Sequence, residues 1–491
     1  MLNKEQQVKN SLIYLLPPFV GNLIPIITLP IFTRILSKED FGAYALAQVY
    51  GFFVTGCANF GLRPIYERNF FQYDKAPQKT SALLYSTILF VVATLIFFLV
   101  VTLFFRHPIA RFIIGSENYS KLLFLTFCSS AIMSLKIYYL AYFKSIENAK
   151  SFSWYTIDEY LIGFVISFVL VVILKIGVLG LPYGQLVASI VVLLLLTCRF
   201  LKSHPFAFDW QLLKDSLKIS YPLTPQIFIG VIGSQFDKYM LGLLNSVGGV
   251  GVYSIGQKIA NAVFIYMTAI QNVFSPQVYK RMFNLGDKGG ESIGRYLTPF
   301  AYVSTALALV VALFSEEIIM LLTPPPYHGA IDVVAIFAMY YSFLFFGKQP
   351  QLLYSKKTFI TSMLTIGGLL LNVAINIPFI KMWGVAGAAW GSLLSGLLFT
   401  GVAFVVSQKY YRIEWEFRKL IPIYLILSVA TILMIALRHT SCPYILRLSF
   451  KLFMLSIYTY LGVKLRVLTL ANFNLLKSFI PSGLKLRTSL S

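Results

Sequence analysis

The sequence is dominated by apolar runs of about 20 residues, the length that an α-helix needs to cross the hydrocarbon of a bilayer. About fourteen such runs can be recognised, at residues 11–33, 41–62, 81–105, 119–143, 155–174, 178–200, 216–236, 249–275, 296–315, 329–350, 359–380, 384–407, 419–437 and 443–463. Of the 491 residues, 57% are hydrophobic and 12% charged, against roughly 25% charged in a soluble domain. This excludes a cytosolic enzyme, a disulfide scaffold and a disordered chain. We therefore predict an all-α polytopic membrane protein.

The positive charge lies in short segments between the apolar runs, so the net charge of +22 is a topology signal and no indication of nucleic-acid binding. With both termini in the cytoplasm, roughly 28 of the 41 Lys and Arg residues fall in cytoplasmic segments. None of the connecting segments reaches about 40 residues, which argues against a membrane glycosyltransferase with an external catalytic domain. The four cysteines lack metal-site spacing, and the chain shows neither a nucleophile–histidine–acid pattern nor a phosphate-binding glycine loop, so we expect no metal or cofactor.

Two short motifs recur at nearly the same spacing. Residues Phe41–Gln48 match Val250–Gln257, and residues Gly177–Gly184 match Gly384–Gly391, with offsets of 209 and 207 positions. Shared offsets predict a duplicated unit of six helices. Because six is even, the copies keep the same orientation and would enclose a central cleft that can rock open to either side. We predict an N-terminal lobe at 1–207, a C-terminal lobe at 208–415, and two additional helices with a basic cytoplasmic tail at 416–491.

These motifs also resemble a known family. Residues 33–45 (TRILSKEDFGAYA), 237–242 (DKYMLG) with 250–253 (VGVY), and 384–391 (GVAGAAWG) are similar to segments of bacterial polysaccharide flippases, over roughly residues 1–440. The resemblance implies the O-antigen flippase branch of the MATE-like MOP superfamily. Its members would carry a lipopolysaccharide or other surface-glycan repeat unit, linked to undecaprenyl diphosphate, from the cytoplasmic to the periplasmic leaflet of the inner membrane. A MATE-type multidrug antiporter and a lipid II flippase remain alternatives.

The resemblance makes a lipid-linked oligosaccharide and membrane lipids the expected partners, with a polysaccharide polymerase as a candidate partner, H⁺ or Na⁺ as candidate coupling ions, and a monomer as the expected state. A cleft for such a cargo needs cations and amides for the diphosphate and sugar. The substrate-binding candidates are Arg34, Gln48, Asn59, Arg63, Arg68, Lys136, Gln257, Lys258, Asn261 and Asn272.

Lys258 is the leading candidate, because it lies near mid-membrane on a helical face that also carries Asn261 and Asn272. It could instead bind carbonyl groups or Asp237. Arg34, Arg63 and Arg68 could be interface anchors or topology signals, Lys136 could extend to the interface, and the amides could join helices.

Three carboxylates, Asp158, Glu159 and Asp237, are candidates for coupling to an ion, although each could instead stabilise a helix end. Four prolines in the first run, Pro17, Pro18, Pro25 and Pro30, would leave backbone carbonyls unpaired and bend the helix. They predict a hinge, with a static packing kink as the alternative.

Overall fold

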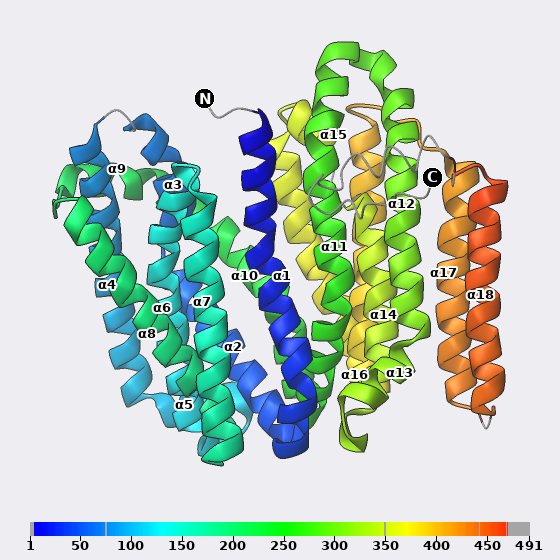
Figure 1. The fold of residues 1–491 in the computed structure, drawn as a ribbon, viewed down its shortest axis with the longest axis horizontal. Coiled ribbons are helices and arrows are strands. Elements are labelled where there is room, and N and C mark those ends of the chain that lie inside the picture. Colours follow the sequence, from blue (N-terminus) through cyan, green and yellow to red (C-terminus); the bar gives the residue numbers. More distant parts are fainter. Residues whose placement is uncertain (1–3, 74–75, 348–349, 441, 468, 470–491) are drawn as a thin grey trace, which may run out of the picture. The chain divides into compact units, whose positions relative to one another are not determined.

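The computed structural model describes residues 4–73, 76–347, 350–440, 442–467 and 469, so the basic tail predicted at the C-terminus lies mostly outside the described residues. The described residues form helices and turns without any strand (Figure 1), which confirms the predicted all-α class. The helices are α1 (Lys4–Ile35), α2 (Lys38–Ala58), α3 (Leu62–Gln72), α4 (Pro77–Phe104), α5 (Arg106–Ile114), α6 (Ser120–Ser145), α7 (Ala149–Phe168), α8 (Gly180–Ser203), α9 (Trp210–Ser220), α10 (Thr224–Leu244), α11 (Val247–Leu285), α12 (Gly289–Leu313), α13 (Ser315–Leu322), α14 (Ala330–Phe343), α15 (Pro350–Tyr354), α16 (Thr358–Gln408), α17 (Phe417–Arg438) and α18 (Tyr444–Lys464).

Among the described residues, eleven helical stretches are long and apolar enough to cross a membrane. Two of them, Val247–Leu313 and Phe359–Gln408, each contain two of the predicted runs. The predicted run at 216–236 is misplaced, because the helix there, α10, begins only at Thr224. A 3-10 turn at Tyr221–Leu223 contains Pro222, which cannot donate a backbone hydrogen bond and separates α10 from the short amphipathic helix α9.

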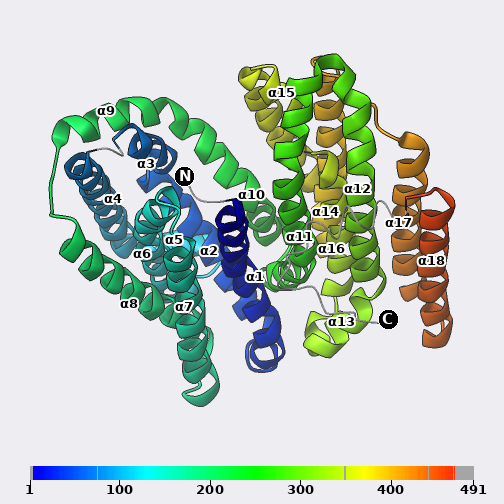
Figure 2. The same ribbon diagram turned by 45° about the horizontal axis from the view of Figure 1, so that its top comes forward.

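The first of two compact units comprises Met1–Ile255 together with Leu322–Tyr327 and Ile377–Ala388. In it, α7 packs against α8 and α1, and α6 packs against α2 and α8 (Figure 2). Buried aromatic and branched side chains such as Phe127, Tyr138 and Val192 fill the space between α2, α4, α6 and α8. The inward faces of α4 and α8 pack against protein, so their outward faces would contact lipid.

The second unit comprises Gly256–Leu321, His328–Asn376 and Ala389–Ser491. Its centre is formed by α12, α14 and α17, whose buried side chains include Leu309, Ile336 and Leu427. The hairpin of α17 and α18 packs beside α12 within this unit (Figure 1). Its outer face carries exposed apolar residues, as expected for helices in contact with lipid.

The second repeated motif begins with a glycine of positive φ in both copies. Its first glycine, Gly177 before α8 and Gly384 within α16, has φ of 70° and 56°, in the left-handed region that favours glycine. Gly384 interrupts α16 and separates it into two helical segments. In both copies the glycine therefore lies at a break before a helix, α8 in one and the second segment of α16 in the other.

Candidate functional site

The first repeated motif brings two equivalent glycines into contact. Ser37 and Asp40 form a capping box at the start of α2, in which Ser37 Oγ accepts from Asp40 N and Asp40 Oδ2 accepts from Ser37 N, each at 3.1 Å. This cap places Gly42 in the first turn of α2, against the first turn of α11. A Cβ atom on Gly42 would lie 1.7 Å from the carbonyl oxygen of Val247, and one on Gly251 would lie 2.0 Å from that of Lys38.

Further contacts within the first unit surround this glycine contact. The Tyr327 hydroxyl donates to the Leu36 carbonyl at 2.6 Å, and its ring packs edge-on against Phe41. Burial and the nearby carboxylates of Asp40 and Glu39 raise the pKa of Tyr327, so its hydroxyl stays protonated and remains a donor. The segment 322–327 and the starts of α2 and α11 all lie at the ends predicted to be external. We call the contact of Gly42 and Gly251, with Tyr327, the outer glycine contact.

A buried charge pair joins three helices of the first unit. Lys136 on α6 forms an ion pair with Glu159 on α7, and their side chains are 2% and 0% exposed. Ser189 on α8 donates to Glu159 Oε1 at 2.6 Å, and Gln185 Nε2 donates to the same oxygen at 3.3 Å. Lys136 does not extend to the interface, because Glu159 compensates its charge inside the bundle. Asp158, the neighbouring coupling candidate, is half-buried.

Lys258 on α11 differs from Lys136. Its side chain is exposed, and it makes no hydrogen bond or ion pair with the described residues. Gln257 and Asn261 beside it are half-buried. Asn272 lies on the same helix, but its side chain is outside the described structure. Asp237, proposed above as a partner of Lys258, accepts from the Tyr253 hydroxyl at 3.2 Å.

The three predicted arginines make their contacts within the first unit. Arg34 Nη1 donates to the Pro30 carbonyl on its own helix at 2.9 Å, Arg63 lies 3.6 Å from Glu67, and Arg68 Nη1 donates to Asn69 Oδ1 at 2.6 Å. All three arginines are exposed.

Asn59 is used within the first unit, where it accepts from the Tyr138 hydroxyl at 2.7 Å and donates to the Thr55 carbonyl at 2.6 Å. Gln48 is half-buried. Pro17, Pro18, Pro25 and Pro30 all lie inside the continuous helix α1.

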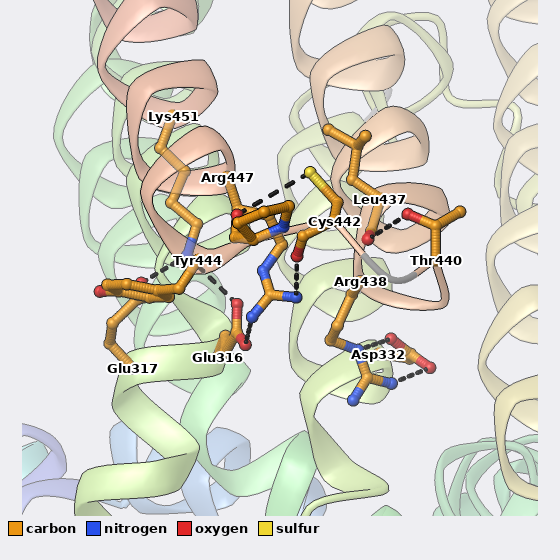
Figure 3. A network of polar contacts seen from close by, with 11 residues as sticks. Glu316, Glu317, Asp332, Leu437, Arg438, Thr440, Cys442, Tyr444, Arg447 and Lys451 are labelled. Atoms are coloured by element: carbon orange, nitrogen blue, oxygen red, sulfur yellow. Dashed lines mark hydrogen bonds and ion pairs between the residues drawn. The ribbon is translucent and has the colours of Figure 1, made fainter.

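Sequence reasoning missed a second ionic cluster, which attaches the hairpin of α17 and α18 to its unit (Figure 3). Lys451 Nζ, on a fully buried side chain of α18, lies 2.5 Å from Glu317 Oε1, and Arg447 Nη2 lies 2.8 Å from Glu316 Oε1. Arg438 of α17 binds both carboxylate oxygens of Asp332 on α14, at 3.1 and 2.6 Å. The signal was present in the sequence, since Lys451 falls about two turns inside an apolar run and Glu316-Glu317 directly follows another.

Eleven long, apolar helical stretches among the described residues define a polytopic membrane protein. The family model described as polysaccharide biosynthesis protein matches residues 7–280, more than half of the chain. The chain belongs to this family.

Solved structures agree on the fold. The lipid II flippase MurJ in an inward closed conformation aligns with a TM-score of 0.66 at 14% identity, over 93% of this chain and 99% of that one. An inward-facing multidrug resistance MATE transporter aligns at 0.58 and 15% identity, over 81% and 97% of the two chains. The Vibrio cholerae MATE transporter VcmN aligns at 0.52 and 12%, over 83% and 98%. No match was found among curated protein sequences.

Proposed function

We propose that the protein carries an oligosaccharide repeat unit, linked to undecaprenyl diphosphate, from the cytoplasmic to the periplasmic leaflet of a bacterial inner membrane. A glycan cannot cross about 30 Å of hydrocarbon unaided, because each hydroxyl would lose its hydrogen bonds to water. The polyprenyl tail can stay in lipid while the sugar and diphosphate pass through a polar route. Family membership supports the link to polysaccharide synthesis. The predicted duplication, with one lobe on each side of a cleft, would permit alternating access.

The observation that carries the proposal is Lys258. A lysine inside an apolar helix is expensive unless its charge is compensated, and the described residues offer it no partner. The diphosphate is the anionic group shared by every cargo of this class, and its oxygens would form charge-assisted hydrogen bonds with Lys258 Nζ. Gln257 and Asn261, beside it on the helix, would contribute to the same route.

The outer glycine contact supports alternating access. It joins equivalent positions of the two repeats at their expected external ends, so its separation would open that side of the route. For ion coupling, we favour Asp237 over Glu159, because a proton or Na⁺ at Glu159 would have to replace its existing partner, Lys136.

The test is surface-glycan display and leaflet location of the carrier-linked glycan in a deletion strain that expresses Lys258→Ala or Lys258→Arg. The deletion should accumulate carrier-linked glycan on the cytoplasmic face. Lys258→Ala should behave like the deletion, and Lys258→Arg should restore part of the display because it keeps the charge. Normal display in Lys258→Ala would remove this lysine from the mechanism.

Lipid II flipping is the second candidate, favoured by the match to MurJ over 93% of the chain, compared with 81–83% for the two MATE transporters. The same deletion strain separates the two. Loss of surface glycan with intact cell wall supports the oligosaccharide cargo, whereas accumulation of lipid II and cell lysis supports the alternative. Unchanged glycan with altered drug sensitivity would instead support an antiporter.

A further inference from the structure

An open groove of about 560 Å³ lies in the first unit, where α9 lies beside α3 and α4 (Figures 1 and 2). One of its walls consists of Phe60, in the turn after α2, and Phe90 of α4, whose rings pack edge to face with centroids 5.7 Å apart. The other wall comes from α9 and the turn after it, which contribute Trp210, Lys214, Leu217, Lys218 and Tyr221. These five positions recur at helical spacing, so one face of α9 lines the groove.

Polar contacts on the other side of α9 hold this face in place. Asp209 caps the helix, because its Oδ1 accepts from Leu212 N at 3.0 Å, and its own N–H donates to Ser86 Oγ of α4 at 2.8 Å. Ser216, on the buried side of α9, accepts from Asn69 Nδ2 of α3 at 3.0 Å. The groove is therefore built by the packing of α9 against α3 and α4.

The groove combines two cations with an otherwise apolar wall. Lys214 and Lys218 are exposed and lie one helical turn apart, a spacing at which like charges repel each other. Asp215 Oδ1 lies 3.8 Å from Lys218 Nζ in an exposed, weak contact, and Lys214 makes no ion pair with the described residues. None of the described residues that line the groove is acidic. An anion bound by both lysines would relieve their repulsion.

The groove extends from a charged edge into predicted hydrocarbon. Lys214 and Lys218 belong to a segment predicted on the cytoplasmic side, whereas Phe90 lies about 13 Å along α4 from the start of the predicted run 81–105. Trp210 and Tyr221, both exposed, flank the lysines, a combination typical of helices at the membrane–water interface. A matching ligand has an anionic head and a long apolar chain.

We propose that this groove binds one anionic phospholipid of the cytoplasmic leaflet, such as phosphatidylglycerol. Its phosphate would accept charge-assisted hydrogen bonds from Lys214 and Lys218, and one acyl chain would pack against Phe60 and Phe90. A zwitterionic lipid is a poorer match, because its headgroup brings a third cation beside the two lysines. None of the candidate cargo residues lines this groove, so the site goes beyond the proposed transport route.

The test is quenching of tryptophan fluorescence by lipids with brominated acyl chains, measured on the full-length protein in phosphatidylcholine nanodiscs. Trp210 is kept as the reporter, and the other four tryptophans are replaced by phenylalanine. Brominated phosphatidylglycerol should reach half-maximal quenching at about a 10- to 30-fold lower mole fraction than brominated phosphatidylcholine. Lys214→Gln/Lys218→Gln should abolish this preference. Phe90→Ala should weaken quenching by both lipids and keep the preference.

The matched control is Lys150→Gln/Lys202→Gln, which removes two exposed lysines from segments predicted on the same side but outside the groove. It should keep the preference for phosphatidylglycerol. Equal quenching by the two lipids, or an equal loss of preference in both double variants, would overturn the proposal. Displacement of brominated phosphatidylglycerol by inorganic phosphate would show that the groove selects a soluble anion. Displacement by undecaprenyl phosphate at a lower mole fraction than by phosphatidylglycerol would assign the groove to the carrier lipid. Either result would overturn a phospholipid site.

Discussion

The outer glycine contact predicts that a single added methyl group at Gly42 shifts the protein toward a state open at that end. In Gly42→Ala the new Cβ would lie 1.7 Å from the Val247 carbonyl oxygen. Since real Cβ contacts are essentially never shorter than 3.0 Å, α2 and α11 must separate here by at least about 1.3 Å. The obstacle is backbone, so no rotamer change can relieve it. Overpacking of this kind costs about 1–3 kcal/mol, which would shift the populations of joined and separated ends roughly 5- to 150-fold.

The assay is the distance between spin labels at Glu39 and Ser246, which are both exposed next to the outer glycine contact. The labels are placed in a variant without the four native cysteines. We expect one short distance in the parent protein and a second, longer population in Gly42→Ala. Gly251→Ala should have the same effect, because its Cβ would lie 2.0 Å from the Lys38 carbonyl oxygen.

The matched control is Gly367→Ala, at a helical glycine whose Cβ would meet no atom within 4 Å. It should leave both the distances and the surface-glycan display unchanged. Folded Gly42→Ala protein with the parent distance distribution and normal display would refute the role of this contact as a gate. A Gly42→Ala protein that fails to fold would identify a purely structural contact, provided that Gly251→Ala fails in the same way.

Three further perturbations test the charges. Lys136→Met or Glu159→Gln alone should destabilise the protein by about 3–5 kcal/mol, because each leaves an uncompensated buried charge. In a thermal-unfolding assay the double variant should recover most of this stability, and an equal loss in all three variants would contradict a compensated pair. Lys451→Met should loosen the α17–α18 hairpin and speed proteolysis after α17, and Glu317→Gln should act in the same direction. Resistance to proteolysis equal to that of the parent protein would show that the ionic cluster does not hold the hairpin. Lys258→Met should fold normally and lose roughly tenfold or more of the glycan display, and full display would exclude a phosphate contact.

The helices could be predicted from sequence because the length of an apolar run is fixed by bilayer thickness, and this holds locally for each run. The run at 216–236 failed because α9 and α10 are joined by apolar residues around Pro222, and hydropathy does not detect a turn inside an apolar stretch. The duplication stays a prediction, and its motifs contain glycines for which the structure gives a physical reason: Gly177 and Gly384 have positive φ, and Gly42 and Gly251 approach neighbouring backbone closely.

The site was less predictable, because charge compensation depends on tertiary contacts. The sequence identifies Lys136 and Glu159 as separate candidates for substrate binding and ion coupling, and shows nothing of the contact between α6 and α7 that pairs them. In the same way, Glu316 and Glu317 precede Arg447 and Lys451 by more than 100 positions.

The lysines inside the apolar helices differ in whether a carboxylate neutralises their charge. This difference suggests which of them would bind the proposed cargo. Lys136 is neutralised by Glu159, and Lys451 by Glu316 and Glu317, so each already has the partner that makes its burial tolerable. A passing diphosphate would have to compete with a carboxylate for either one. Lys258 has no such competitor among the described residues, and an anion that binds there gains the full interaction. The same reasoning separates the variants: we expect removal of a compensated lysine to harm the fold, and removal of Lys258 to harm transport and spare the fold.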